Sequence, residues 1–369
     1  MALHQPRRGA STSVRNASIL ALAALLSAGA ARAAVTFFPE QGKNDIPTEY
    51  FRFDVKEWFS SGSSRYQKEF PFPFQVNGPP ADISMGSTLN FNGLKSDITV
   101  FSEEVRPVGW FSVAVDFGTA GTNGGTGFDH DWINAPNVIL TSPSGFTYVT
   151  PNHEDFSLSQ ESLSGYVRFV SPTAYLRVIS LREGAGTGDS YLHLFDVGLG
   201  YGVYDELVHI TNGVQVAAPD AYINSVIGLP PPGTAFEGLN SSYRFHWQGV
   251  RLALREKLLL GPHLSSEGKF GVIPAASYAG TGIWNLRGDF QQNPSFTQRT
   301  TGHAYDFSLD LAYEVVQYVT LKAGYMLEYF TASGGTDTTR TVAAGDVNDT
   351  LDNVKLLRSG VFVGAAFQF

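Results

Sequence analysis

Two carboxylates, Asp129 and Asp131, stand one residue apart in the stretch GGTGFDHDWI, behind two glycines and ahead of a tryptophan. Neighbouring carboxylates can exchange a proton with a reacting group, or they can supply oxygen ligands to a cation. On an extended segment, side chains two residues apart point the same way. Both aspartates can therefore face one cleft while His130 points away from it.

A metal site is not expected here. Calcium takes about six to eight oxygen ligands, and DHDWIN offers too few in series for a loop of the Asp-x-Asp-x-Asp-Gly type. A calcium ion bound by the loop stays a lesser alternative. We predict no metal and no cofactor, and general acid–base chemistry or binding of a cationic group remain.

Alternating strands must position this pair. In YDFSLDLAYEV, residues 305–315, bulky apolar side chains alternate with Asp306, Asp310 and Glu314, and the chain ends on SGVFVGAAFQF with the same spacing. Strands with an apolar outer face and a polar inner face are typical of bacterial outer-membrane barrels. A soluble β-sandwich is the alternative, and it gives the terminal aromatic strand no purpose.

About ten such segments can be counted, and an even number fits a closed antiparallel ring. They lie near residues 50–69, 86–105, 109–119, 156–171, 190–209, 240–258, 267–288, 302–316, 318–333 and 354–369. The sequence therefore predicts an all-β fold, a closed antiparallel transmembrane β-barrel of about ten strands with long extracellular loops. One domain covers residues 34–369.

Residues 1–33 have the layout of a cleaved signal peptide. Three arginines precede an apolar run over residues 17–30, and Ala-Arg-Ala at 31–33 offers a cleavage site. The run is shorter than the roughly 20 residues that span a membrane as a helix, so a retained anchor is the weaker reading. The predicted location is the bacterial outer membrane.

Composition restricts the partners. Removing the signal segment and its four arginines leaves 21 basic against 34 acidic residues, a net charge of −13. Nucleic acid is therefore excluded as a partner and a cationic ligand is favoured. With no cysteine in the chain, a disulfide framework is excluded.

The barrel interior is expected to be filled. Barrels with open aqueous channels have about 16 to 18 strands, so general porin activity is disfavoured. We expect the inward charges to pair with one another; they are Asp116, Asp306, Asp310, Glu314, Lys322, Glu328 and Arg358. In YRFHWQGVRLALRE the apolar parity switches near Gln248 and Gly249, which predicts a bulge.

The stretch from Gly121 to Trp132 resembles the second loop of the omptin family of outer-membrane proteases, in which a glycine pair is followed by Asp-x-Asp-Trp. The glycines Gly124 and Gly125 fall into that spacing. Further stretches resemble the same family, namely DVKEWFSSG, NHEDF around His153 and SYAGTGIWNLRGDFQ. The resemblance extends over essentially all of the chain after residue 33.

The resemblance implies a protease in which Asp129 and Asp131 face an Asp-His pair, with the attacking water held between an aspartate and the histidine. It also implies lipopolysaccharide as a partner needed for activity. We expect a monomer in the outer membrane.

The facing half departs from the family pattern. Counting from Trp284, Asp289 keeps one acid of the pocket for basic residues, but Gln291 stands at the second aspartate and Asn293 at the histidine. All three positions share the parity that would face the cleft. Glutamine and asparagine do not take up protons near neutral pH, so the water has no obvious base.

The other acid of that pocket is altered as well. It falls near Tyr66, and Glu69 is a displaced substitute. No nearby histidine replaces the missing base directly, since His303 has the parity of the lipid-facing set. His153, in a long loop, is the one candidate that could reach the cleft.

Three hypotheses follow. The first is an omptin-like barrel with an acidic extracellular cleft that binds a cationic peptide or surface ligand, proteolysis being lost or weakened. The second is an active omptin-type aspartic endopeptidase that cleaves near basic residues and uses a displaced base. The third is a narrow transport or structural barrel.

Overall fold

The computed structural model describes residues 34–37, 51–71, 84–134, 139–141, 147–149, 153–183, 191–218 and 229–369. The predicted signal peptide and the loop after the first barrel strand lie outside these residues. Within them, no helix is long and apolar enough to cross a bilayer. The strands are β1 (Ala34–Phe37), β2 (Phe51–Pro71), β3 (Ser84–Val108), β4 (Phe111–Asn134), β5 (Ile139–Thr141), β6 (Thr147–Val149), β7 (Glu154–Glu183), β8 (Tyr191–Ala217), β9 (Asn240–Leu259), β10 (Leu264–Ile283), β11 (Phe296–Val316), β12 (Val319–Ser333), β13 (Thr336–Thr341) and β14 (Gly345–Gln368).

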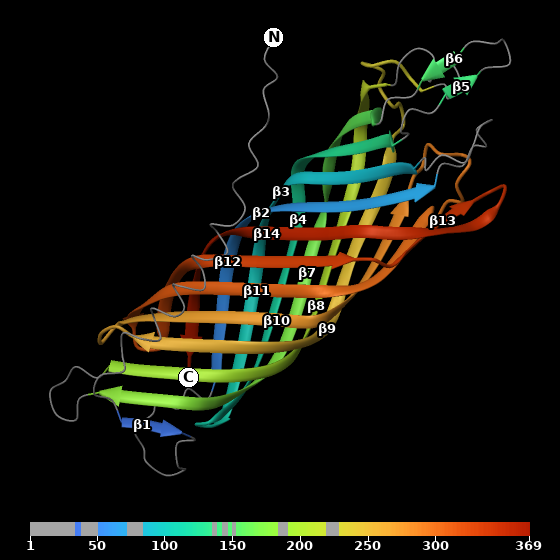
Figure 1. Cartoon of the computed structure of the whole chain (residues 1–369). Helices are drawn as coiled ribbons and strands as arrows, with labels where there is room; N and C mark the ends of the chain where they lie inside the picture. The colour runs from blue at the N-terminus through green and yellow to red at the C-terminus, as the bar shows by residue number, and fades with distance from the viewer. Residues whose placement is uncertain are drawn as a thin grey trace, which may run out of the picture.

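Ten of the described strands close into a ring, as predicted. The order of hydrogen-bonded neighbours is β7, β4, β3, β2, β14, β12, β11, β10, β9 and β8, and β8 pairs back onto β7. All pairings are antiparallel, and the ring forms a long barrel with inclined strands (Figure 1). Two short strands add to it: β1 pairs with β7, and β13 lies between the upper parts of β11 and β14. The chain is therefore an all-β closed barrel.

Several strands are longer than the sequence suggested, most of them toward the end of the barrel where β4 carries Asp129 and Asp131, while β7 also continues past residue 171 toward the opposite end. β4 runs to Asn134 where a loop was predicted after residue 119, and β7 covers 30 residues, Glu154–Glu183. At the opposite end the turns are short, as between β11 and β12 around Tyr318. Outer-membrane barrels have short periplasmic turns and long extracellular connections, which places the extended end outside the cell. Asp129 and Asp131 therefore lie on a strand that continues above the membrane.

The predicted bulge near Gln248 and Gly249 is wrong. β9 keeps an unbroken register with β8 from Asn240 to Leu259, and its odd-numbered side chains stay inside throughout. The register shift lies instead on β10, between Val272 and Ser277. What changes along β9 is the environment, because its outer face passes from water into lipid at this height.

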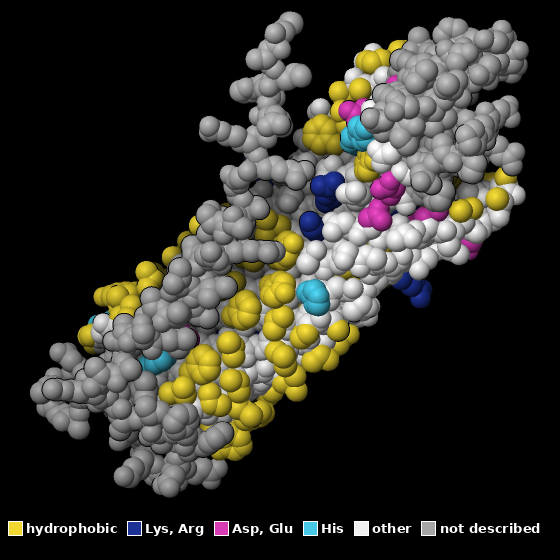
Figure 2. Space-filling model, viewed as in Figure 1, with side chains coloured by type: hydrophobic (Ala, Val, Ile, Leu, Met, Phe, Trp, Pro, Cys, Tyr) yellow, Lys and Arg dark blue, Asp and Glu magenta, His cyan; other side chains and the backbone are white. Residues whose placement is uncertain are grey.

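Two zones result. The membrane zone is the part of the barrel on the periplasmic side of Gln248 and Gly249, where outward side chains are apolar and inward side chains are charged. The extracellular zone is the part on the other side of these residues, where inward side chains are aromatic and outward side chains are polar. On β9 the exposed lower residues are Val250, Leu252 and Leu254 around buried Arg251 and Arg255, and the buried upper residues are Tyr243, Phe245 and Trp247. Figure 2 shows the hydrophobic side chains gathered over the lower part of the barrel and mostly polar surface above.

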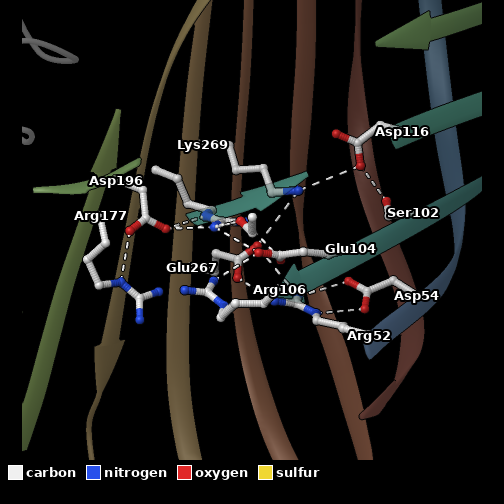
Figure 3. A network of polar contacts seen from close by, with 12 residues as sticks. Arg52, Asp54, Ser102, Glu104, Arg106, Asp116, Arg177, Asp196, Glu267 and Lys269 are labelled. Carbon is white, nitrogen blue, oxygen red and sulfur yellow. Dashed lines mark hydrogen bonds and ion pairs between the residues drawn. The ribbon is translucent and has the colours of Figure 1, made fainter. Parts of the chain in front are cut away.

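The interior of the membrane zone holds ion pairs, as expected from the inward charges. Lys322 lies 2.9 Å from Asp54 and 3.4 Å from Asp310, and Arg251 binds Asp306. Arg52 and Glu267, on opposite parts of the wall, are 2.7 Å apart (Figure 3). Such pairing offsets much of the cost of enclosing charges in a barrel. Glu314, half-buried near the periplasmic end of β11, faces the interior and lies 3.9 Å from His263. Glu328 differs from the prediction, since it is buried and its Oε2 has no hydrogen-bond partner among the described residues.

The extracellular zone is filled by aromatic rings that meet across the lumen. β2 and β9 stand five places apart in the ten-strand ring, yet Tyr66 and Tyr243 have ring centroids only 5.9 Å apart. Below them, Trp247 and Tyr204 both pack on Phe330. A void of about 60 Å³ lies between this layer and the charged layer. The described side chains therefore fill the lumen at this height.

The zone boundary can be tested on β9. Leu252→Arg is expected to destabilise the folded barrel by about 2–4 kcal/mol, because it places a charge against the lipid. Gln248→Arg, on the same face above the boundary, is expected to cost about 1 kcal/mol or less. Equilibrium unfolding in lipid vesicles measures both, and equal costs would contradict the boundary.

Candidate functional site at the extracellular mouth

The glycine pair lets β4 bulge before it reaches the aspartates. Gly124 and Gly125 have φ angles of 79° and 134°, in the region that side chains disfavour. A Cβ on Gly125 would lie 3.0 Å from the carbonyl oxygen of Asn92. The register with β7 shifts between Asn123 and Thr126, and pairing then continues on both sides of β4. The glycines thus set the register of the aspartates.

The two aspartates share one face of β4. Asp129 lies between Leu89 of β3 and Ser159 of β7, and Asp131 lies between Ser87 and Ser157. This inward face lines the mouth, defined here as the open extracellular end of the barrel above the aromatic layer.

His130 and Trp132 occupy the other face, as the spacing predicts. Trp132 covers Gly86 so closely that a Cβ there would lie 2.1 Å from the indole. His130 Nε2 is 2.9 Å from an oxygen of Asp155. His153 also belongs to this outer cluster, since its Nδ1 lies 2.7 Å from Asn134. The histidine that sequence analysis kept as a candidate base is therefore held outside the mouth.

The electrostatics of the pair favour a retained proton. Burial raises the pKa of Asp129 well above its usual range, and the negative charges of Asp131 and Glu161 raise it further. Burial likewise raises the pKa of Asp131, although a hydrogen bond from Ser87 opposes the rise. The Oδ1 atom of Asp129 is buried without a hydrogen-bond partner. The carboxyl group of Asp129 can therefore keep a proton, or accept a hydrogen bond from a ligand, at this oxygen.

The segment facing the pair does not have the extended form that the prediction required. β10 ends at Ile283, and residues 284–295 form a loop of turns, so alternating parity does not apply to Asp289, Gln291 and Asn293. Gln291 is tied to the β13 end by its backbone N–H to Arg340 O (2.7 Å) and by Nε2 to Thr341 O (3.1 Å). Asn293 is exposed, with a φ of 74°.

Arg287 is the mouth residue that sequence analysis missed. Its Nε and Nη2 donate to the two oxygens of Asp289 at 2.8 and 2.7 Å. Its positive charge also lowers the pKa of both Asp129 and Asp131, which places it toward the pair. The acid expected to receive a basic substrate group is thus already neutralised by the chain's own arginine. The only sequence signal was that Arg287 stands two residues before Asp289.

The floor of the mouth is a hydrogen-bonded layer. Asp337, fully buried, accepts from Tyr66 (3.0 Å), Gln298 (2.6 Å) and Lys68 (3.1 Å). The expectation for Glu69 is wrong: it is exposed and accepts hydrogen bonds from Ser84 and Asn134 on the outer face. An odd-numbered position on β2 points outward, which gives Tyr66 and Lys68 the inward places.

No described histidine hydrogen-bonds either aspartate of the pair. The remaining five lie elsewhere: His193 with Glu256, His246 with Asp205, His263 with Glu314, His303 on Pro274 O, and His209 exposed on β8. Among the described residues, no group of three or more His, Asp or Glu side chains could hold a metal ion.

A comparison with protein families matches residues 184–369 to the family described as Pom, Protochlamydia outer membrane protein. The match covers 186 of 369 residues, just over half of the chain. The chain belongs to the Pom family. This Pom protein is therefore an outer-membrane protein, and the matched part runs from before β8 to the end, including Arg287 and Asp289. A comparison with curated protein sequences found no match.

Among solved structures, this Pom barrel is similar to the outer-membrane protease OmpT from Escherichia coli, with a TM-score of 0.64 and 9% identity over 89% of this chain and 100% of that chain. A FadL homologue from Pseudomonas aeruginosa gives a TM-score of 0.31 at 10% identity, over 87% of this chain and 90% of that one. The toluene transporter TodX from Pseudomonas putida gives 0.26 at 8%, over 91% and 96%. The first likeness establishes an omptin-like fold, and the other two are too weak to use.

A stability measurement can test the raised pKa of the Asp129 carboxyl. The folded barrel holds this proton to higher pH than the unfolded chain does, so ionisation costs stability as pH rises above the ordinary value of 3.8. Asp129→Asn is therefore expected to stabilise the barrel by on the order of 1 kcal/mol at pH 8, with the gain vanishing at acid pH. Unfolding curves at both pH values measure it, with exposed Asp346→Asn as the control. A gain that is the same at both pH values would contradict the assignment.

Proposed function

We propose that this Pom protein is an omptin-like barrel whose acidic mouth binds cationic groups and whose proteolytic activity is lost or weakened. The observation that carries the proposal is the pairing of Asp129 and Asp131 on the inward face of β4, with one buried oxygen of Asp129 left without a partner. A buried acceptor of this kind gains most from a charged donor. Lysine or arginine side chains of a peptide, or a cationic group on a cell surface, have that chemistry.

The loss or weakening of proteolysis is inferred from the residues that face Asp129 and Asp131. Hydrolysis by an attacking water needs a base that accepts its proton, and histidine suits that role near neutral pH. Here the positive charges that act on both aspartates belong to Arg287 and Lys68, whose side chains carry donors and no acceptor. Asn293 is exposed on a loop of turns and cannot serve as a base either.

One observation favours the second candidate, an active endopeptidase with a displaced base. The negative charge of Asp131 raises the pKa of Asp129, as expected where two neighbouring carboxyls compete to stay ionised. In such a pair the ionised partner can activate water while the protonated one donates to the substrate. The transport alternative has no comparable support, because aromatic side chains fill the lumen.

The test uses the chain from Ala34 onward, refolded with lipopolysaccharide and given a fluorescent peptide that contains paired basic residues. The proposal expects saturable binding, seen as a rise in anisotropy, without cleavage. Cleavage by the wild type that disappears in Asp129→Asn would overturn the loss of proteolysis and support the endopeptidase. If the wild type neither binds nor cleaves the peptide, both the cation-binding proposal and the endopeptidase alternative are overturned.

Arg287 provides a prediction of its own. Because its charge occupies the neighbourhood of the pair and neutralises Asp289, Arg287→Gln is expected to tighten binding of the basic peptide by about tenfold, the effect of one charged contact. The same anisotropy titration measures the change. Arg340→Gln, an exposed arginine of the β13–β14 hairpin paired with Asp346, is the control and is expected to change little. Weaker binding in Arg287→Gln would show that the arginine assists the ligand instead.

A further inference from the structure

A cavity of about 440 Å³ opens at the periplasmic end of the barrel, far from the mouth. Its rim is formed by short turns and by the last residue, Phe369, and its walls carry the charged side chains of the membrane zone. The wall charges of interest lie around Glu104 and Asp196, which Figure 3 shows from close by.

Arg255 is fully engaged. It binds Asp196 at 2.9 and 2.6 Å and Glu104 at 2.9 and 3.0 Å, from two different walls of the barrel. A second group of charges around Arg52 and Lys322 is closed by its own carboxylates, Asp54 among them. Most of the cavity wall is therefore already neutralised.

Arg106 and Arg177 are not neutralised to the same degree. Arg177 is 4% exposed, and its Nε donates a hydrogen bond to Asp196 at 2.9 Å. Its two terminal nitrogens have no hydrogen-bond partner among the described residues. Arg106 is 8% exposed and binds Glu104 at 2.9 Å and the carbonyl of Gly109 at 3.3 Å. Both line the cavity.

The two guanidinium groups lie near one another (Figure 3). The positive charges of Arg177 and Arg255 act on Arg106, and the carboxylates Glu104 and Asp196 oppose them. Around this point three guanidiniums, including that of Arg255, share the two carboxylates Glu104 and Asp196. One positive charge is therefore in excess on this part of the cavity wall, where the side chains are largely buried and like charges repel more strongly than in bulk water.

We propose that the periplasmic cavity is a binding site for an oxyanion, a carboxylate or phosphate group on a solute that enters from the periplasm, held between Arg106 and Arg177. The planar fork of a guanidinium matches the paired oxygens of either group. Bound there, the anion supplies the missing negative charge and accepts from the free nitrogens of Arg177. The site is independent of the mouth and of its proposed function.

Titration calorimetry on the barrel in lipid nanodiscs tests the proposal, with inorganic phosphate and succinate as probes and chloride at equal ionic strength as the reference. At least one oxyanion is expected to bind at one site, and the preferred probe separates phosphate from carboxylate ligands. Arg177→Gln is expected to weaken binding by about tenfold or more, and Arg106→Gln likewise. Arg168→Gln, an outer-face arginine paired with Asp205, is the matched control.

Thermal unfolding guards against a merely structural effect. Since Arg255 retains both Asp196 and Glu104, neither substitution leaves a carboxylate unpaired, and both variants are expected to fold with little change in ligand-free Tm. The rise in Tm with added oxyanion should vanish in both. The proposal would be overturned if neither probe binds. It would also be overturned if Arg168→Gln weakens binding as much as the two cavity substitutions do. So would variants that lose ligand-free stability yet keep the full oxyanion-induced rise.

Discussion

Arg358→Leu is expected to lower the free energy of unfolding by about 3–5 kcal/mol, the usual effect of removing one partner from a buried ion pair. Arg358 is fully buried and reaches across the lumen from β14 to Glu206 of β8, with 2.7 Å between Nη2 and the carboxylate. It also donates to Ser60 Oγ at 3.0 Å and to Leu94 O at 3.1 Å. Leucine would leave Glu206, only 1% exposed, as an unpaired charge.

The double variant Arg358→Leu/Glu206→Leu separates charge from packing. Replacing both members of a buried pair by apolar side chains is often close to neutral, so much of the lost stability should return. Urea unfolding in vesicles, followed by the fluorescence of the buried Trp58 and Trp247, measures both variants. A double variant as unstable as the single one would assign the loss to packing or to the Ser60 and Leu94 contacts.

Binding of a basic peptide at the mouth is expected to strengthen as pH rises, and Asp129→Asn is expected to remove most of that dependence. Asp129 has a raised pKa, so it is protonated and neutral at low pH and ionised only above its shifted value. A cationic ligand gains its full attraction from the ionised form. A lost charge-assisted contact corresponds to about 10- to 100-fold in affinity.

Anisotropy titrations between pH 5 and pH 8 measure this effect. Asp131→Asn is expected to weaken binding as well, and in addition to ease ionisation of Asp129 by removing the neighbouring charge. Asp346→Asn, a carboxylate exposed at the same end of the barrel, should leave the profile unchanged. Affinity that falls with rising pH in the wild type would contradict the cation-binding role.

The ring of ten strands was predictable because inside–outside alternation is a local pattern that repeats along the chain. The same rule failed at Gln248. A switch in which parity is apolar was interpreted as a bulge, whereas β9 keeps its register and its surroundings change from water to lipid. The strand extensions were missed for a related reason: above the membrane both faces of β4 carry polar residues, and alternation no longer marks a strand.

The site was predictable only where it is local. The shared face of Asp129 and Asp131 follows from a spacing of two residues on an extended chain. The conformation opposite depends on contacts far apart in sequence, such as the bond between Gln291 and the β13 end. Alternation could not place Arg287 before the conformation of that loop was known, whereas the opposite parity of Tyr66 and Glu69 on β2 already argued against Glu69.

The aromatic layer that includes Tyr66 and Tyr243 separates the extracellular mouth of the barrel from its periplasmic cavity. Asp129 responds to the pH and solutes outside the cell, while Arg106 and Arg177 are in contact with those of the periplasm. One chain can thus carry two chemistries of opposite charge preference without either ligand diffusing from one site to the other.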